Sequence, residues 1–220
     1  MKKKLLIFGS GDLGIEVLDL IHNLNKKQNQ WDVVGFVSNS KKKKINNIKV
    51  YNSKEIPSNL NKNISAICAI MDAKIKESVI KNEINNRLKL ITLIHPSSNI
   101  SQTTKIGRGS IVMSNCAISY NVKIGNNVII SSNCAIGHMS NIGDNTLLSP
   151  GCLINGNTSI EKNCIIGSGV ITHPRVKIGS NCIIGLGTTI FKNLQKNTSL
   201  INQQRLIKLK RNSKKTFQKK

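Results

Sequence analysis

The chain has 220 residues, a formal net charge of +23 and 39% hydrophobic residues, but only 3% of its residues are aromatic. So few rings argue against a core built on aromatic packing, and favour a narrow interior of aliphatic and small side chains. The lysines occur in runs without interleaved aromatic residues, which argues against a specific nucleic-acid surface, and no apolar run approaches the ~18 residues of a membrane span.

The first 93 residues alternate between apolar strand patterns and helix patterns. We expect strands at residues 3–8, 31–37 and 64–71, and helices at residues 13–25 and 73–86. Residues 38–48 are polar and rich in lysine, and we expect a mobile loop there. Residues 88–94 lead into the second half of the chain. This alternation predicts a small, parallel, Rossmann-like α/β domain over residues 1–93.

A glycine motif, Gly9-Ser10-Gly11-Asp12-Leu13-Gly14, lies between the first strand and the first helix. Backbone N–H groups at such a turn can hold a phosphate. A dinucleotide site would also require an acidic residue after the second strand, where this chain has Ser38-Asn39, so a dehydrogenase is disfavoured. The alternative interpretation is a tight strand-to-helix turn without a ligand.

From residue 94 onward, aliphatic side chains recur at every sixth position. Seventeen positions lie six apart from Ile94 to Ile190; sixteen are Ile, Leu or Val, and the exception is Thr172. Neither a helix nor a single strand produces this spacing, and a short fixed period is typical of a solenoid. We therefore predict a solenoid over residues 94–194.

The other positions of the repeat agree with a narrow interior. From Ser110 to Thr188, the fourth residue after the repeat position is small or β-branched. Five of the six cysteines fall on it, so we interpret these cysteines as interior residues without a redox or metal role. The residue directly after the aliphatic is often glycine, which we interpret as a corner with positive φ. These glycines are Gly107, Gly125, Gly137, Gly143, Gly167, Gly179 and Gly185.

Among the four histidines, His138 is the candidate for chemistry. We expect His22 on the surface of the first helix, His95 to cap a turn and His173 to belong to a corner. His138 occupies a non-interior position in an unbroken part of the repeat, so its imidazole can face outward. A neutral imidazole there can act as a general base on an amine or hydroxyl that attacks a thioester, while a corner N–H stabilises the oxyanion.

These patterns resemble bacterial sugar O- and N-acetyltransferases that act on sialic acids and UDP-4-amino sugars. The similarity includes Leu5-Leu6-Ile7-Phe8-Gly9-Ser10-Gly11 and Val34-Gly35-Phe36, and continues without gaps from His138 to Asn193. It implies a Rossmann-like sugar-nucleotide domain joined to a left-handed parallel β-helix with triangular coils of three hexads. It also implies acetyl-CoA as cosubstrate, a homotrimer, an active site between neighbouring β-helices and no metal.

The resemblance also assigns the site residues of the expected reaction. His138 matches the catalytic base, and Gly156 matches the glycine whose N–H meets the acetyl carbonyl. The acetyl-CoA groove corresponds to Gly156, Gly167, Ser168, Gly185 and Leu186. The sugar or nucleotide sugar is expected at Gly9, Ser10, Gly11, Asp12, Ser38 and Asn39.

Several positions depart from the family pattern. Met139 stands where an acidic residue usually follows the base, Leu147 where a second histidine is common, and Ser38-Asn39 where acids often hold the acceptor. Near the end of the repeat, Asn202-Gln203-Gln204-Arg205 stands where the family usually has Gly-x-Pro-Ala. The acceptor sugar, the choice between N- and O-transfer, and the acyl group stay open. The alternative function is a non-catalytic trimeric scaffold or a degenerate subunit.

The last residues, 195–220, are expected to form a basic tail. Residues 205–220 carry eight Lys or Arg and no acid, which is typical of a solvated end or of an electrostatic contact with anionic lipid or with the phosphates of CoA. Met1 to Lys4 are followed by only four apolar residues before Gly9, so we expect no signal peptide and a cytoplasmic location.

Overall fold

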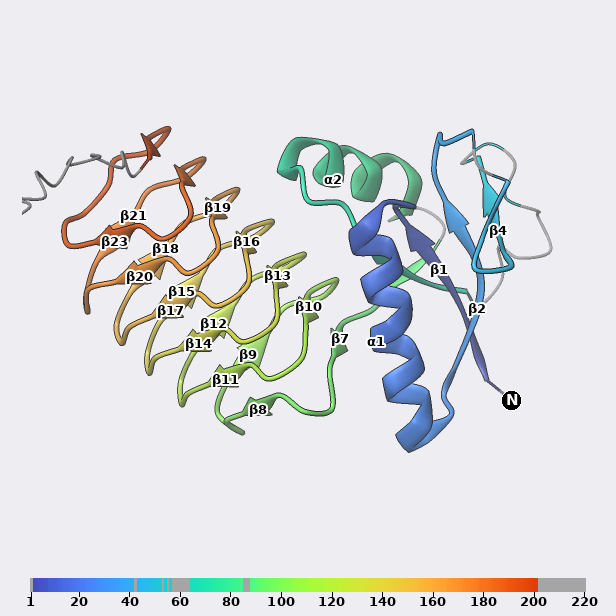
Figure 1. The fold of residues 1–220 in the computed structure, drawn as a ribbon, viewed down its shortest axis with the longest axis horizontal. Coiled ribbons are helices and arrows are strands. Elements are labelled where there is room, and N and C mark those ends of the chain that lie inside the picture. Colours follow the sequence, from blue (N-terminus) through green and yellow to red (C-terminus); the bar gives the residue numbers. More distant parts are fainter. Residues whose placement is uncertain are drawn as a thin grey trace, which may run out of the picture.

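A computed structural model describes residues 2–41, 43–52, 54, 56, 64–84 and 88–201. An α/β unit is followed by a parallel β-helix, which confirms the predicted fold class at this level (Figure 1). No helix within these residues is both long enough and apolar enough to cross a bilayer.

The N-terminal unit is a six-stranded sheet between two helical layers. Side chains of β1 (Lys3–Phe8) alternate between the two faces. Leu5 and Ile7 pack with the first helix, α1 (Asp12–Gln28), whereas Leu6 and Phe8 pack on the opposite side with residues 80 and 84. The helical layer there is α2 (Ala73–Val79), continued by the π-helical turn η3 (Ile80–Ile84). The strands, in spatial order, are β3 (Lys44–Ile45), β4 (Ile48–Tyr51), β2 (Trp31–Val37), β1 (Lys3–Phe8), β5 (Ser65–Cys68) and β6 (Lys89–Leu90).

The predicted loop at residues 38–48 is partly wrong. β3 and β4 form an antiparallel pair, and β4 continues the sheet through the register of Phe36 with Val50. Ile45 and Val50 are buried in this pair. Their burial accounts for strand formation in a segment whose many lysines suggest solvent exposure.

The β-helix consists of three parallel sheets that meet at three corners. Backbone pairing connects residues 18 apart, as in Ile111 with Ile129 and Ala117 with Ala135. The seven-stranded sheet contains β7 (Leu93–Ile94), β10 (Ile111–Val112), β13 (Ile129–Ile130), β16 (Leu147–Leu148), β19 (Ile165–Ile166), β22 (Ile183–Ile184) and β24 (Ser199–Leu200). The six-stranded sheet contains β8 (Asn99–Ile100), β11 (Ala117–Ile118), β14 (Ala135–Ile136), β17 (Leu153–Ile154), β20 (Ile171–Thr172) and β23 (Thr189–Ile190). The five-stranded sheet contains β9 (Lys105–Ile106), β12 (Lys123–Ile124), β15 (Asn141–Ile142), β18 (Ser159–Ile160) and β21 (Lys177–Ile178).

The interior of the β-helix follows the repeat. The sixth-position aliphatics and the small residues four positions later fill it, and all five repeat cysteines are buried and free, which confirms their interior placement. β24 pairs with β22 and so continues the seven-stranded sheet beyond residue 194. Most of the predicted basic tail, residues 202–220, lies outside the described residues.

The expectation of positive φ at the repeat glycines is wrong. The left-handed residue of most corners is an asparagine or glycine two positions later, for example Asn127 with φ 57° and Gly109 with φ 74°. A Cβ on Gly107 would instead lie 2.5 Å from the backbone of Gly125 in the next coil. Glycine is needed at these positions because adjacent coils approach too closely for a side chain.

The N-terminal unit packs on the β-helix through apolar side chains and one buried lysine. Val17 and Ile21 of α1 belong to the same buried cluster as Ile111 and Ile129, which point outward from the seven-stranded sheet. Lys76 of α2 is 0% exposed, and its Nζ donates a hydrogen bond to the backbone carbonyl of Asn127 at 2.9 Å. Burial lowers the pKa of Lys76 to about 8.

Candidate active site

The candidate site lies at the corner between the six-stranded and five-stranded sheets. Tyr120, His138 and Gly156 follow β11, β14 and β17 respectively, so they occupy the same corner position on three consecutive coils. We call this corner the His138 corner. His138 is exposed and projects from the wall of the β-helix rather than into its interior, as its place in the repeat predicts.

The imidazole of His138 lies between an aromatic ring and a glycine. The Tyr120 ring stacks on it with centroids 5.5 Å apart and an interplanar angle of 9°. On the side of the next coil, a Cβ on Gly156 would be only 2.6 Å from Cε1 and 2.7 Å from Nε2 of His138. Any other residue at 156 would therefore collide with the imidazole, which explains the glycine there.

Both imidazole nitrogens are available for chemistry. Within the described part of the chain neither has a hydrogen-bond partner, and the backbone N–H of Gly156 donates to no other described group. A free nitrogen and a nearby free N–H are the two functions that a base-assisted acyl transfer requires. The distance between this N–H and an oxyanion depends on how a substrate binds.

Thr172, the single exception in the aliphatic series, fixes the backbone beside this site. Its hydroxyl accepts a hydrogen bond from the backbone N–H of Asn155 at 3.0 Å, and its carbonyl accepts one from the Asn155 side chain at 2.6 Å. Asn155 directly precedes Gly156. The one polar residue in the aliphatic series thus marks the contact that positions Asn155 and Gly156. The sequence reasoning did not use this signal.

Met139, directly after the histidine, offers neither a charge nor a strong hydrogen-bond acceptor. It is 50% exposed and adopts a left-handed conformation with φ 57°. Among the described residues of the β-helix, only Met139 and Arg175 combine positive φ with a residue other than asparagine or glycine, and both lie at the His138 corner. Such backbone strain is typical of functional sites.

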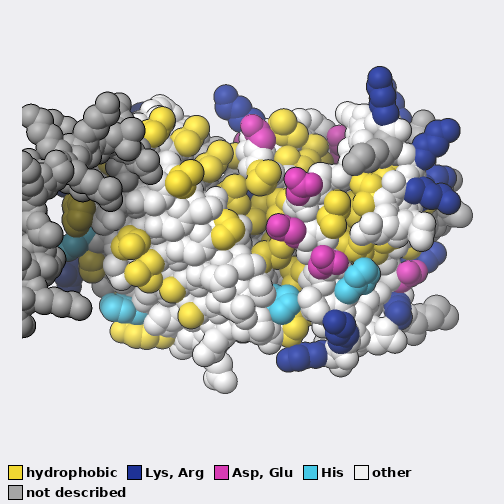
Figure 2. Space-filling view, viewed as in Figure 1, with side chains coloured by type: hydrophobic (Ala, Val, Ile, Leu, Met, Phe, Trp, Pro, Cys, Tyr) yellow, Lys and Arg dark blue, Asp and Glu magenta, His cyan; other side chains and the backbone are white. Residues whose placement is uncertain are grey.

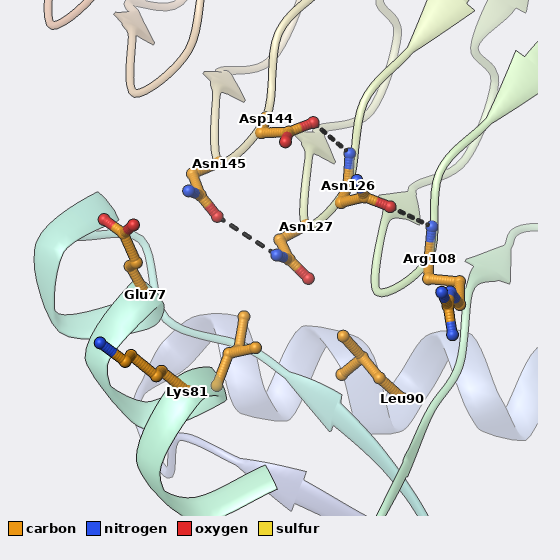
Figure 3. Close-up of a pocket in the computed structure, with 9 residues that line it drawn as sticks. Glu77, Lys81, Leu90, Arg108, Asn126, Asn127, Asp144 and Asn145 are labelled. Carbon is orange, nitrogen blue, oxygen red and sulfur yellow. Dashed lines mark hydrogen bonds between the residues drawn. The ribbon is translucent and has the colours of Figure 1, made fainter. Parts of the chain in front are cut away.

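Asp144, the nearest acid to His138 along the chain, and Leu147, at the position of the family's second histidine, both lie away from the imidazole. Asp144 is at the corner between the five-stranded and seven-stranded sheets, where its Oδ1 accepts a hydrogen bond from the backbone N–H of Asn126 at 2.7 Å (Figure 3). That corner faces α2 across a polar cleft of about 560 Å³ that also exposes Glu77 and Arg108. Leu147 is buried, and it packs in the cluster shared with α1.

Shallow cavities flank the His138 corner on both sides. The cavity on the six-stranded sheet has about 530 Å³ and is lined by Tyr120, Gly137 and Asn155 among others. The cavity on the five-stranded sheet has about 340 Å³ and is lined by Met139 and by two lysines, Lys105 and Lys123. The imidazole thus lies on a ridge between an apolar surface and a basic one.

Of the five predicted acetyl-CoA residues, Gly156 lies at the His138 corner and the other four lie at a different corner. Gly167, Ser168, Gly185 and Leu186 lie between the seven-stranded and six-stranded sheets, before β20 and β23. Within one chain they are therefore at the opposite edge of the six-stranded sheet from His138. Leu186 is 75% exposed, and Gly167 lies so close to the next coil that a Cβ would be 2.7 Å from the Leu186 nitrogen.

The N-terminal unit has a cavity of about 250 Å³ at the carboxyl ends of its strands. Of the predicted substrate residues, Gly9, Ser38 and Asn39 line it, whereas Ser10, Gly11 and Asp12 do not. Glu83 of η3 also lines it and is the only charged group among the described residues that do so. A carboxylate thus lines this cavity from another element, although no acid follows the second strand. The sequence reasoning missed it because only the tertiary fold brings η3 to this edge.

The glycine motif has a structural reason of its own. Gly9 has φ +112°, and a Cβ on it would be 2.4 Å from the carbonyl oxygen of Ala69. A Cβ on Gly14 would be 2.3 Å from the carbonyl oxygen of Gly9. Gly11 begins α1 as its N-cap, and a Cβ there would meet open space. Two of the three glycines therefore serve the close approach of chain segments.

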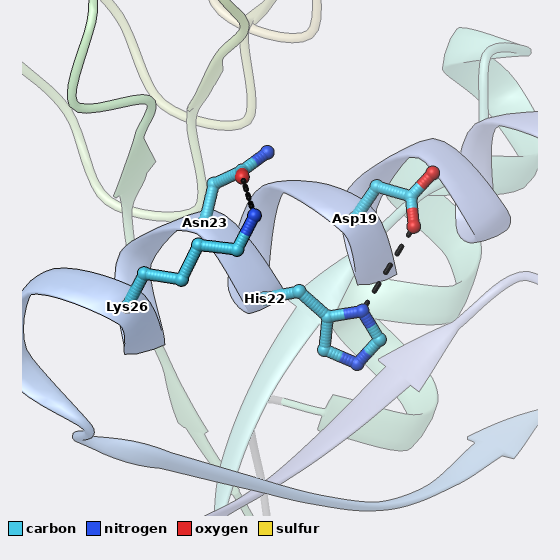
Figure 4. A network of polar contacts seen from close by, with 4 residues as sticks. All are labelled: Asp19, His22, Asn23 and Lys26. Atoms are coloured by element: carbon cyan, nitrogen blue, oxygen red, sulfur yellow. Dashed lines mark hydrogen bonds and ion pairs between the residues drawn. The ribbon is translucent and has the colours of Figure 1, made fainter.

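The remaining histidines have local roles. His22 is exposed on α1, 3.9 Å from the carboxylate of Asp19 (Figure 4). Nδ1 of His95 accepts a hydrogen bond from the backbone N–H of Ser97 at 3.1 Å, which confirms that it caps a turn. His173 lies at the turn after β20, with Nδ1 3.1 Å from the carbonyl oxygen of Pro174. No group of three or more potential metal ligands occurs within the described ranges.

Comparisons with protein families match both parts of the chain. Residues 4–82 match the PglD N-terminal domain, and residues 103–138, 139–173 and 157–192 match the bacterial transferase hexapeptide repeat. Both matches agree with the resemblance drawn from the sequence. The chain has no significant match among curated proteins.

Solved structures with the same fold cover nearly the whole chain. The acetyltransferase domain of PglB from Neisseria gonorrhoeae FA1090 is 23% identical, with a TM-score of 0.83, and the alignment covers 91% of this chain and 97% of that one. WeeI from Acinetobacter baumannii AYE is 21% identical, with a TM-score of 0.78 and coverages of 90% and 96%. PerB from Caulobacter crescentus, solved with CoA and GDP-perosamine, is 21% identical, with a TM-score of 0.71 and coverages of 90% and 94%. At these identities the likeness establishes a shared fold.

Proposed function

Because the chain combines a PglD N-terminal domain with bacterial transferase hexapeptide repeats, we propose that it transfers an acetyl group from acetyl-CoA to an amino or hydroxyl group of a nucleotide-linked sugar. The observation that carries this proposal is the exposed imidazole of His138, held between Tyr120 and Gly156 with both nitrogens free. The PglB domain has also been solved with acetyl-CoA, and PerB with CoA and a nucleotide sugar.

The proposed reaction is a direct transfer. A nitrogen of His138 removes a proton from the acceptor amine or hydroxyl while that atom attacks the thioester carbonyl carbon. The backbone N–H of Gly156 stabilises the negative charge on the carbonyl oxygen. When the tetrahedral intermediate collapses, the carbon–sulfur bond breaks, and the imidazolium returns its proton to the departing thiolate.

The donor site requires a second copy of the chain. Gly167, Ser168, Gly185 and Leu186 are separated from His138 by the width of the six-stranded sheet, so one chain does not supply a compact site. In a homotrimer, the corner carrying these residues in one subunit can face the His138 corner of the next. The outward side chains Ala117, Ala135, Leu153 and Ile171 form an apolar stripe on the sheet between the two corners that such packing would cover.

Charge favours an anionic cosubstrate at the β-helix. Between residues 94 and 196 there are eight Lys or Arg but only two acids, Asp144 and Glu161. In the view of Figure 2, the acidic side chains gather over the N-terminal unit, and the far end of the β-helix presents apolar patches. The phosphates of CoA and of a nucleotide sugar would be attracted to this basic surface.

The acceptor is proposed to bind in the cavity at the N-terminal unit. Ser38, Asn39 and Glu83 place polar groups around a surface that Ile70, Ile75 and Val79 make apolar. An apolar wall with a few polar groups suits a nucleoside, because the base can pack on the wall while the hydroxyls or base N–H groups donate to Glu83. Glu83→Gln is expected to raise KM for the nucleotide sugar about tenfold, with kcat little changed.

The direct test is His138→Ala. We expect loss of about 10² to 10⁴ in kcat for release of CoA in a screen of sugar nucleotides, because the general base is removed. Since His138 is exposed, the trimer and its thermal unfolding should change little. His22→Ala, on the exposed face of α1, serves as a control that removes a histidine and leaves the site intact. Wild-type rates in His138→Ala would contradict the proposed mechanism.

A second candidate is a non-catalytic trimeric scaffold, which Met139 favours because it cannot orient the imidazole through a carboxylate. Ligand binding distinguishes the two functions. An enzyme should be stabilised by about 3 kcal/mol when acetyl-CoA is present at 100 times its Kd, seen as a higher unfolding temperature. No stabilisation at millimolar acetyl-CoA would support the scaffold.

A further inference from the structure

We propose that Tyr120 is the positioning residue of His138, performing by aromatic stacking the orienting role that no acidic residue can perform here. This inference rests on the proposed function, in which His138 is the base. It assigns a role to a residue that neither the repeat nor the family resemblance singles out.

The imidazole has no hydrogen-bonded support among the described residues. Neither of its nitrogens has a protein partner, and the next residue, Met139, carries an uncharged thioether. A histidine that acts as a base needs a defined orientation, which a hydrogen bond to the second nitrogen commonly supplies. Within the described residues of one chain, packing supplies it.

Two flat surfaces provide that packing. The ring of Tyr120, from the preceding coil, lies nearly parallel to the imidazole at 5.5 Å between centroids and 9° between planes. The backbone of Gly156, from the following coil, closes the other face, since a Cβ there would come within 3.0 Å of three imidazole atoms. The imidazole is therefore confined in a slot one coil wide, with its edge and both nitrogens open to a substrate.

The stack also suits the charge that develops during the reaction. When His138 takes the proton of the acceptor, its ring becomes a cation, and the electron-rich face of Tyr120 attracts a cation within about 6 Å. Tyr120 is thus expected to lower the barrier to transfer more than it strengthens substrate binding. Because it is 49% exposed, its side chain contributes little to the core of the β-helix.

The experiment compares Tyr120→Ala with Tyr120→Phe. Removal of the ring in Tyr120→Ala should lower kcat about 10²-fold, since a base misplaced by about 1 Å loses that much, while KM for acetyl-CoA stays within about twofold. Tyr120→Phe keeps the stacked ring and should retain at least about a third of wild-type kcat. Equal unfolding temperatures of the three proteins would show that the β-helix is intact.

A second measurement reports the stack without using activity. In the NMR spectrum, the ring C–H resonances of His138, assigned with His138→Ala, should be displaced by the ring current of residue 120. The displacement should persist in Tyr120→Phe and vanish in Tyr120→Ala. Persistence of the same shifts in Tyr120→Ala would overturn the proposed stack.

The outcomes separate this inference from the proposed function. Absence of acetyl transfer by the wild-type protein would refute the function, and wild-type transfer by His138→Ala would refute its mechanism, while the NMR comparison would still test whether Tyr120 holds the ring. Wild-type kcat in Tyr120→Ala would overturn the positioning role alone. A loss in Tyr120→Phe as large as in Tyr120→Ala would also overturn it, because the hydroxyl rather than the ring would then be responsible.

Discussion

The corner between the five-stranded and seven-stranded sheets is regular, whereas the His138 corner departs from the repeat. In the regular corner, five left-handed asparagines form a ladder in which each side-chain N–H donates to the next side-chain oxygen at 2.9–3.3 Å. We call it the asparagine ladder; its members are Asn127, Asn145, Asn163, Asn181 and Asn197. At the His138 corner, Met139 and Arg175 replace asparagines, and the ring nitrogens have no hydrogen-bond partner in the part of the chain that the structure describes.

The difference separates structural from functional use of the same repeat. In the ladder, side-chain hydrogen bonds are used within the fold, and the ladder begins where Lys76 binds the carbonyl of Asn127. At the His138 corner, the backbone is strained and the imidazole nitrogens can form hydrogen bonds with a substrate. Substitutions at the two corners should therefore affect different properties.

Gly156→Ala should have the largest effect on activity. The added Cβ would lie within 3.0 Å of three imidazole atoms and would displace the ring, so kcat should fall at least about 10²-fold. Gly143→Ala is the matched control, because its Cβ would lie 2.5 Å from the backbone of Glu161, away from the site. The control should lower the unfolding temperature without comparable loss of kcat in the folded protein, and equal kcat losses in both would contradict the distinction.

Lys76→Met should change how stability depends on pH. The folded pKa of about 8 lies below the ordinary value of 10.5, so between these pH values the unfolded chain holds a proton that the folded protein lacks. The lysine therefore makes stability rise with pH in this window, by about 3 kcal/mol in total. Burial raises the pKa of Cys68 to about 12, which acts oppositely above pH 9.

Because Cys68 and Lys76 interact electrostatically, the difference in unfolding free energy between proteins with and without Lys76→Met is best measured in a Cys68→Ala background. Measured by urea denaturation at pH 7.5 and pH 10, this difference should favour Lys76→Met more at the lower pH. If this difference did not change with pH, the pKa of Lys76 would be the same in the folded and unfolded states, and its burial would not disfavour the charged form.

Asn163→Ala should destabilise the ladder by about 3 kcal/mol. It removes two side-chain hydrogen bonds worth about 1 kcal/mol each. It also places alanine, which lacks the polar group that helps asparagine adopt the left-handed conformation, at φ 61°. Asn163→Gly removes the same hydrogen bonds but tolerates positive φ, so it should lose about 1 kcal/mol less. Denaturation of both variants separates the two contributions, while acetyl transfer by the folded protein should be unchanged.

Met139→Asn should have the smallest effect, and it should raise the stability of the protein, whereas Asn163→Ala lowers it. Asparagine tolerates the left-handed conformation better than methionine, so the β-helix should gain about 1 kcal/mol. The reciprocal change Asn133→Met, at a corner with φ 61°, should lose a similar amount. A loss of stability in Met139→Asn would show that the methionine side chain makes a favourable contact that outweighs the strain.

Much of the fold was predictable because its repeat is local. A small residue four positions after each aliphatic identified the interior, and it correctly placed Cys116 and Cys164 inside. The period also placed His138 on the outer wall. The role of the repeat glycines was misread, since the sequence does not reveal that Gly107 faces the backbone of the next coil.

The sequence by itself determined the period, the interior and the outward position of His138, because neighbouring coils repeat one local pattern and each hexad carries its own core residues. Only the tertiary structure decided that Tyr120 stacks on His138, that Glu83 completes the N-terminal cavity, and that Gly167 and Gly185 lie across a sheet from the imidazole. These relations depend on how the coils stack and how the two units pack together. Contacts between residues that are distant in the chain produce no periodic pattern in the sequence.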